Sequence, residues 1–205
     1  FINSMSNATK NSELNIIQKY LNSQSGNVLL FSNNPELIIC SLTDKLHVFS
    51  SNEQCISDKI DNFLSTNTFQ TELSKYGQKF DTIILHDIFE EIKHPELFLL
   101  NLDSFLNNDG SIFCSISNFY HITNIVNLLI GKPLQSNSII YDLDIIISIV
   151  NKINMHLDKI FRIHKDFLHE ETNIDETLIP QKLIDMIKKI PDHDVSQYVL
   201  MIGKN

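Results

Sequence analysis

The chain has no tryptophan and few glycines, prolines or cysteines, with 5, 5 and 3 of these among 205 residues. The cysteines, Cys40, Cys55 and Cys114, lack CxxC spacing, which predicts buried thiols and argues against a zinc or redox motif. Basic residues are outnumbered: 16 Lys and Arg against 25 Asp and Glu give a net charge of −9. That balance argues against broad nucleic-acid binding, which needs a basic face.

Long apolar runs are also missing, and we find no signal peptide, so we expect a cytoplasmic protein with no membrane span. Hydrophobic residues make up 42% and charged residues 20%, as in ordinary globular domains. We expect residues 12–205 to form a single domain. Residues 1–11 are interpreted as a disordered or vector-derived terminus.

Short apolar runs alternate with amphipathic segments along the chain, and this alternation predicts an α/β fold with a parallel core. The expected strands span 28–31, 46–49, 82–85, 111–116, 156–163 and 197–202, with a weak edge strand at 66–69. The expected helices span 12–21, 53–63, 96–106, 119–130, 143–154 and 180–190. The last two strands are expected to form an antiparallel edge of the sheet.

Ligands of open α/β sheets bind beyond the carboxyl ends of the strands, near the point where strand order reverses. Polar residues follow four of the expected strands. They are Ser32, Asn33 and Asn34 after the first strand, Ser50 after the second, His86 and Asp87 after the third, and Ser117 and Asn118 after the fourth. We expect these residues to converge on one edge of the sheet.

Residues 80–131 contain the most specific sequence motifs of the chain. An expected apolar strand begins at Phe80-Asp81 and leads to Asp87, to Glu90-Glu91 and to a helix that begins at Pro95. A turn is expected at Asn108-Asp109-Gly110. After it come Ser115-Ile116-Ser117-Asn118, His121 and Leu128-Leu129-Ile130-Gly131-Lys132. This order resembles the back half of a class I S-adenosylmethionine (SAM)-dependent methyltransferase. The resemblance covers 12–204 in element order and implies a Rossmann-like fold. Its mostly parallel sheet would have seven strands, an antiparallel edge hairpin and helices on both faces.

The resemblance implies SAM as cofactor and assigns site residues by position. The residues implied to bind the cofactor are Phe31, Ser32, Asn33, Asn34, Ser50 and Asp87. His121 and His86 are the candidate catalytic bases. Glu90 and Glu91 are interpreted as a solvated loop, and no metal site is predicted.

The front half departs from the family in two ways. The loop after the first strand has no glycine, although glycine lets backbone approach a ligand closely. Leu30 and Ser50 stand where the family has carboxylates, and losing a charge-assisted hydrogen bond costs about 1.5–3 kcal/mol. SAM binding is therefore expected to be weak.

Two functions fit these observations. One is a SAM-dependent methyltransferase for a small molecule or a glycan. The other is an inactive methyltransferase-like binding or partner protein that has lost SAM. A protein partner or a homodimer fits either one. The acidic segment 165–179 is interpreted as a solvated loop or a lid.

Overall fold

The computed structural model describes residue 13 and residues 15–21, 26–32, 46–49, 56–131, 140–164 and 180–204. The strands are β1 (Val28–Ser32), β2 (Leu46–Phe49), β3 (Phe80–His86), β4 (Leu106–Ser117), β5 (Met155–His164) and β6 (Val195–Lys204). The helices are α3 (Ile56–Ser65), α4 (Phe69–Ser74), α5 (Pro95–Asp103), α6 (Ile122–Leu129), α7 (Leu143–Lys152) and α8 (Gln181–Ile187). The 3-10 turn η1 spans Phe89–Glu91, and residues 15–21 are also helical.

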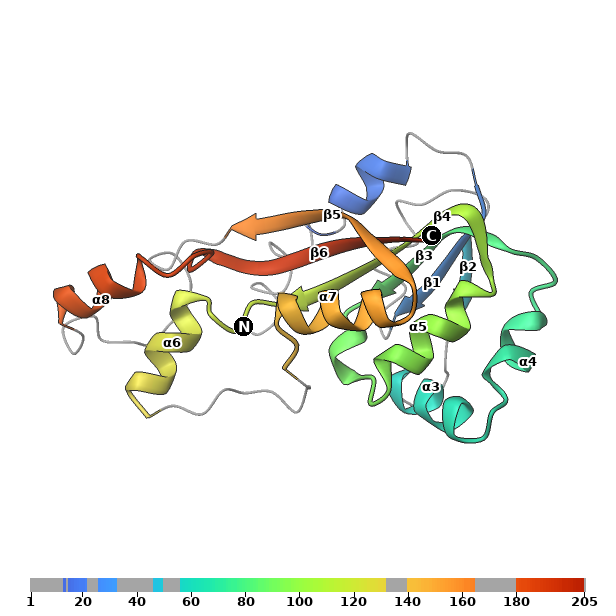
Figure 1. Ribbon diagram of the computed structural model, residues 1–205, viewed down its shortest axis with the longest axis horizontal. Coiled ribbons are helices and arrows are strands. Elements are labelled where there is room, and N and C mark those ends of the chain that lie inside the picture. Colours follow the sequence, from blue (N-terminus) through green and yellow to red (C-terminus); the bar gives the residue numbers. More distant parts are fainter. Residues whose placement is uncertain are drawn as a thin grey trace.

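The strands form one sheet in the order β2-β1-β3-β4-β6-β5 (Figure 1). The first four strands of this order are parallel, and β6 runs antiparallel to both β4 and β5. The predicted Rossmann-like class, with its parallel core and antiparallel edge, is confirmed. Within the described residues the sheet has six strands, because the segment expected to supply a seventh is not a strand.

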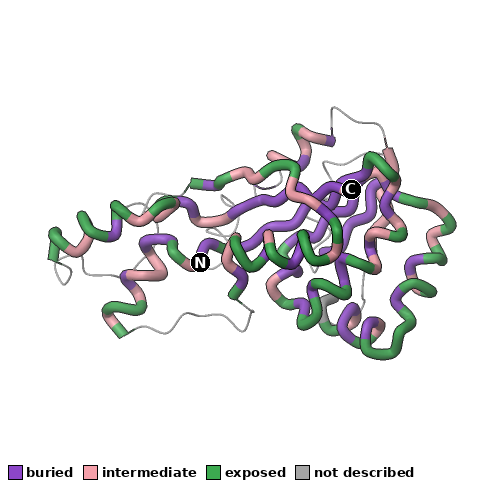
Figure 2. Tube along the Cα trace, in the orientation of Figure 1, coloured by how far each residue is buried: buried purple, intermediate pink, exposed green. Residues whose placement is uncertain are grey.

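Side chains alternate between the two faces of the sheet, as the strand period of two requires. On one face, Leu29, Ile83 and Ile112 join the larger core cluster, which α3, α4, α5 and α7 cover. On the other face, Leu30 and Ile84 pack against the helix at 15–21. Figure 1 shows this helix across the sheet from α3, α5 and α7, so helices lie on both faces. Figure 2 shows the central strands buried along most of their length.

Asp81, the second residue of the family-like Phe80-Asp81 pair, ties three strands together. Its Oδ2 accepts a hydrogen bond of 2.8 Å from the backbone N–H of Asn27, just before β1. Its Oδ1 accepts one of 2.7 Å from the side chain of Asn107 in β4. This part of the motif therefore has a structural role at the end of the sheet away from the expected site.

Three local predictions were wrong. Residues 66–69 do not form an edge strand: Asn67 has a positive φ of 56°, and α4 follows with Phe69 and Leu73 buried on one face. Asn108-Asp109-Gly110 is not a turn between elements but lies inside β4, where the register with β3 shifts. The helix expected from residue 119 begins at Ile122, because His121 is its N-cap.

Cys114, one of the three expected buried thiols, is free and 1% exposed, and burial raises its pKa. Cys40 and Cys55 lie outside the described residues.

The helix expected at residue 12 is seen from Glu13. Among the described residues, no helix is long and apolar enough to cross a membrane.

Helices α6 and α8 form a small separate cluster beyond the end of the sheet (Figure 1). Ile122 and Val126 of α6 pack with Ile187 of α8. Gly131, with a φ of 76°, follows α6 in the left-handed conformation that glycine adopts at no steric cost. The cluster extends the edge at which β4 ends.

Candidate functional site

The strand order reverses between β1 and β3, since the chain passes from β1 to β2 on one side and then to β3 on the other. Ser32 at the end of β1 is in register with His86 at the end of β3. Their side chains meet, with Ser32 Oγ 3.1 Å from His86 Nδ1, and both residues are buried. The structure thus joins these two predicted site residues at the switch point, where ligands of such sheets bind.

Asp87 follows directly and turns the chain out of β3. Its φ of 52° lies in the left-handed region, which Asp tolerates better than most residues. One carboxylate oxygen lies 3.7 Å from His86 Nε2, and the side chain is 37% exposed. Asp87 therefore faces solvent while it stays in contact with a buried imidazole.

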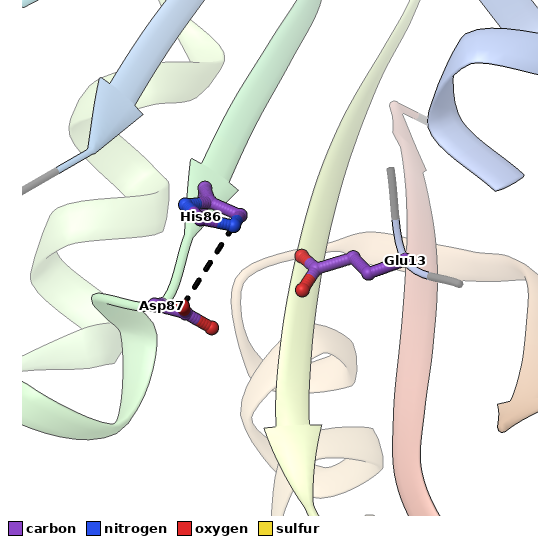
Figure 3. Close-up of side chains that lie close together, drawn as sticks. All are labelled: Glu13, His86 and Asp87. Atoms are coloured by element: carbon purple, nitrogen blue, oxygen red, sulfur yellow. Dashed lines mark ion pairs between the residues drawn. The ribbon is translucent and has the colours of Figure 1, made fainter. Parts of the chain in front are cut away.

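Glu13, a residue that the sequence analysis did not select, reaches the same place from the N-terminal helix. It is 1% exposed, and Gln197 Nε2 in β6 donates a 3.4 Å hydrogen bond to its carboxylate. Figure 3 shows the Glu13 side chain pointing toward His86 and Asp87. An acidic residue in the first turn of a helix is usually explained by the helix dipole, so nothing about Glu13 in the sequence indicates a site.

Glu90, in η1, is a further acidic residue of this edge. Its carboxylate accepts hydrogen bonds from the backbone N–H of Ser117 at 2.8 Å and from its hydroxyl at 3.0 Å. Burial raises the pKa of Glu90, and the two bonds from Ser117 partly oppose that rise. The contact joins two of the family-like sequence motifs: Glu90 belongs to the motif after β3, and Ser117 to the motif at the end of β4.

A polar cavity of about 220 Å³ opens beside this contact. It is lined by Asp87, Ile88, Phe89, Glu90, Glu91, Ser115, Ser117 and Gln197. Its carboxylates and hydroxyls suit a neutral or cationic ligand that donates hydrogen bonds, and they disfavour an anion. Glu90, which was expected in a solvated loop with Glu91, is half-buried, Glu91 is exposed, and both line this cavity.

A second cavity of about 140 Å³ lies beyond β4. It is lined by Ser117, Asn118, Phe119, Tyr120, Asp142, Leu143, Asp144 and Tyr198, so the two cavities share Ser117. Burial, with the hydrogen bond to Asp192, raises the pKa of Tyr198 to about 12. Its hydroxyl therefore stays protonated near neutral pH and acts as a donor.

His121 is buried and caps α6, where its Nδ1 accepts a 3.4 Å hydrogen bond from the N–H of Thr123. In that tautomer Nε2 carries the proton and is a donor. His121 is not among the residues that line either cavity. The structure thus brings Asp87 and Asn118 to the two cavities and leaves His121 in a capping contact; catalytic roles for His121 and His86 stay predictions.

Of the residues assigned to the cofactor, Phe31, Ser32 and Asp87 are described, and the first two are 0% exposed. The ring of Phe31 packs against Phe49 and Phe98 in the larger core cluster, so its backbone is the part that a ligand could contact. Leu30 packs in the other cluster and brings no carboxylate. Asn33, Asn34 and Ser50 lie outside the described residues, as does the segment 165–179.

The raised pKa of Glu90 predicts how stability depends on pH. A carboxyl group whose pKa is higher in the folded state binds its proton more tightly there, so the free energy of unfolding falls as pH rises from the ordinary Glu pKa through the folded-state pKa. Glu90→Gln is isosteric and uncharged and removes this loss. In denaturant titrations at about pH 4 and pH 7, the stability of Glu90→Gln relative to the natural chain should increase with pH. A constant or shrinking difference would contradict the assigned shift.

No protein-family model matches the sequence, and neither does any curated protein at the required significance. The fold, in contrast, matches many solved structures. Magnesium protoporphyrin IX methyltransferase from Synechocystis PCC 6803, solved with bound S-adenosylhomocysteine (SAH), aligns at a TM-score of 0.59 and 10% identity, over 97% of this chain and 84% of that one. A SAM-dependent methyltransferase from Clostridium acetobutylicum ATCC 824 aligns at 0.55 and 10% identity, over 95% and 90%. These likenesses establish the fold as that of class I SAM-dependent methyltransferases.

Proposed function

We propose that this chain, which has the fold of class I SAM-dependent methyltransferases, transfers a methyl group from SAM to a hydroxyl group of a small molecule or glycan. The observation that carries the proposal is the pairing of Glu90 with Ser117 at the wall of the polar cavity beyond β3 and β4. This cavity lies at the edge of the sheet where such folds bind their ligands. The Synechocystis structure, solved with SAH and with SAM, supports the choice of cofactor.

Glu90 takes the role of general base in this proposal. A base works best when its pKa lies near the working pH, and burial moves the pKa of Glu90 in that direction. The sequence analysis assigned the role to His121 or His86. Glu90 is preferred because it lines the cavity, whereas His121 caps α6 and His86 contacts Ser32.

The acceptor is proposed to be small and uncharged or cationic. A cavity of about 220 Å³ is below the usual range for drug-sized ligands, so it would hold a single ring or the end of a larger molecule. Hydroxyl groups of such a ligand can donate to Asp87 and Glu90. The in-line transfer itself would depend mainly on positioning of the methyl donor and the acceptor oxygen.

The competing function is a methyltransferase-like binding or partner protein without SAM. The burial of Leu30 in the apolar core favours it, because the cofactor's ammonium has no carboxylate there. Incubation with methyl-labelled SAM and a panel of small polyols and saccharides tests the choice. Label transferred to a hydroxyl group supports the enzyme, and intact labelled SAM with every acceptor supports the partner protein.

A further inference from the structure

Glu13, His86 and Asp87 bring two carboxylates and an imidazole together from segments far apart in the sequence. Their ligand-type atoms all lie within 4.8 Å of one another (Figure 3). Two ligands at about 2.1 Å from a zinc ion lie at most about 4.2 Å apart. The 3.7 Å between His86 Nε2 and Asp87 falls inside that span, and Glu13 needs only a small movement to join them. We propose that these three side chains bind one divalent transition-metal ion.

Neighbouring side chains orient two of the three ligands. Ser32 Oγ lies 3.1 Å from His86 Nδ1, and a histidine that donates Nδ1–H to this hydroxyl presents the basic Nε2 toward Asp87. Gln197 holds the Glu13 carboxylate through its 3.4 Å hydrogen bond. Metal-binding histidines and carboxylates are usually supported by outer contacts of this kind.

The donor set defines the class of ion. One imidazole nitrogen and two carboxylate oxygens suit Zn²⁺, Mn²⁺, Fe²⁺ or Co²⁺, whereas Mg²⁺ and Ca²⁺ prefer oxygen ligands throughout. The two carboxylates also balance the charge of a divalent ion. Glu13 and His86 are each 1% exposed, so the ion would be held from the protein side.

The remaining coordination positions would face the cavity. Asp87 is one of the three proposed ligands, and Gln197 supports the ligand Glu13. Both also line the polar cavity beyond β3 and β4. Three protein ligands with open positions are typical of metal sites that bind a water molecule or a substrate oxygen. The site is thus placed where an acceptor could reach the ion.

Titration with Zn²⁺, followed by calorimetry, tests the proposal; Co²⁺ absorption spectra report the coordination. The variants are Glu13→Gln and Asp87→Asn, which keep shape and remove a charged ligand; Asn also tolerates the positive φ of residue 87. Changes to outer contacts alone cost about 10- to 100-fold in metal affinity. We therefore expect one bound ion per chain and at least about a 100-fold loss in either variant.

Two matched control variants distinguish ion binding at this site from ion binding by exposed side chains. Glu96→Gln removes an exposed carboxylate that pairs with Lys152, and His164→Asn removes an exposed imidazole 2.9 Å from Asp194. Both should bind Zn²⁺ like the natural chain. The proposal is overturned if no ion binds, if Glu13→Gln and Asp87→Asn bind unchanged while circular dichroism shows an intact fold, or if His164→Asn alone loses the ion.

Ion binding goes beyond the proposed methyl transfer and is measured without SAM. The two proposals share Asp87, but the methyl transfer does not use Glu13. Glu13→Gln should therefore lose the ion and keep its affinity for SAH. A chain that binds SAH and no Zn²⁺ overturns the ion site alone, and one that binds Zn²⁺ and no SAH overturns the methyl transfer alone.

Discussion

Replacing Phe98 with Ala is expected to lower the free energy of unfolding by about 3–5 kcal/mol. Phe98, in α5, is 0% exposed, and its ring contacts Phe31 and Phe69 edge-on with centroids 5.7 and 5.5 Å apart. These three rings belong to the larger core cluster between the sheet and its helices. The substitution leaves a cavity that well-packed neighbours cannot fill, in addition to the lost burial.

Denaturant titration at neutral pH measures the effect, and Leu100→Ala is the matched control. Leu100 lies on the same helix but is 53% exposed, so its loss should change stability by less than about 0.5 kcal/mol. Because small domains are stable by only about 5–15 kcal/mol, Phe98→Ala should leave a marginal protein. Equal effects in the two variants would contradict the proposed packing.

Replacing Glu90 with Gln is expected to reduce methyl transfer by about 100-fold or more, the usual contribution of a positioned base. The variant keeps an acceptor for the Ser117 N–H bond, but it loses the negative charge and with it the ability to take a proton. Its affinity for SAM should not change, since the base acts on the acceptor. The loss should appear in kcat at saturating SAM, measured with whichever hydroxyl compound accepts label from the natural chain.

Two comparison variants make the result specific. Glu96→Gln removes an exposed carboxylate of α5 and should transfer methyl groups normally. His121→Ala removes the cap of α6 and should cost about 1 kcal/mol of stability, with a smaller effect on transfer than Glu90→Gln. A larger loss in His121→Ala than in Glu90→Gln would return the role of base to His121.

The sheet could be predicted from the sequence because its strands are short apolar runs separated by strong helical patterns. Buried parallel strands such as 28–31 and 82–85 have few alternative structures. The prediction of a strand at 66–69 was wrong because β-branched threonines favour a strand only where a sheet edge is available. Here Phe69 and Leu73, four residues apart, gain more by packing as a helix against the core.

The site was predicted only where its residues follow strands. His86 and Asp87 could be placed at the carboxyl edge because β3 was clear, and so could Ser32 at the end of β1. Glu13 and Gln197 could not, because they arrive from a helix and from the antiparallel strand, and their positions depend on tertiary packing. The bond between Glu90 and Ser117 depends on the turn η1, which has no signature in the sequence.

Titration of the natural chain with SAH, followed by calorimetry, tests the central claim that this fold still binds the methyl donor. The account predicts saturable one-to-one binding with a Kd above about 10 μM, because Leu30 and Ser50 replace two charge-assisted contacts. A submicromolar Kd would show that those two positions matter less than proposed. No saturable binding up to about 5 mM SAH, a concentration that corresponds to only about 3 kcal/mol of affinity, would contradict the claim if circular dichroism shows the protein folded.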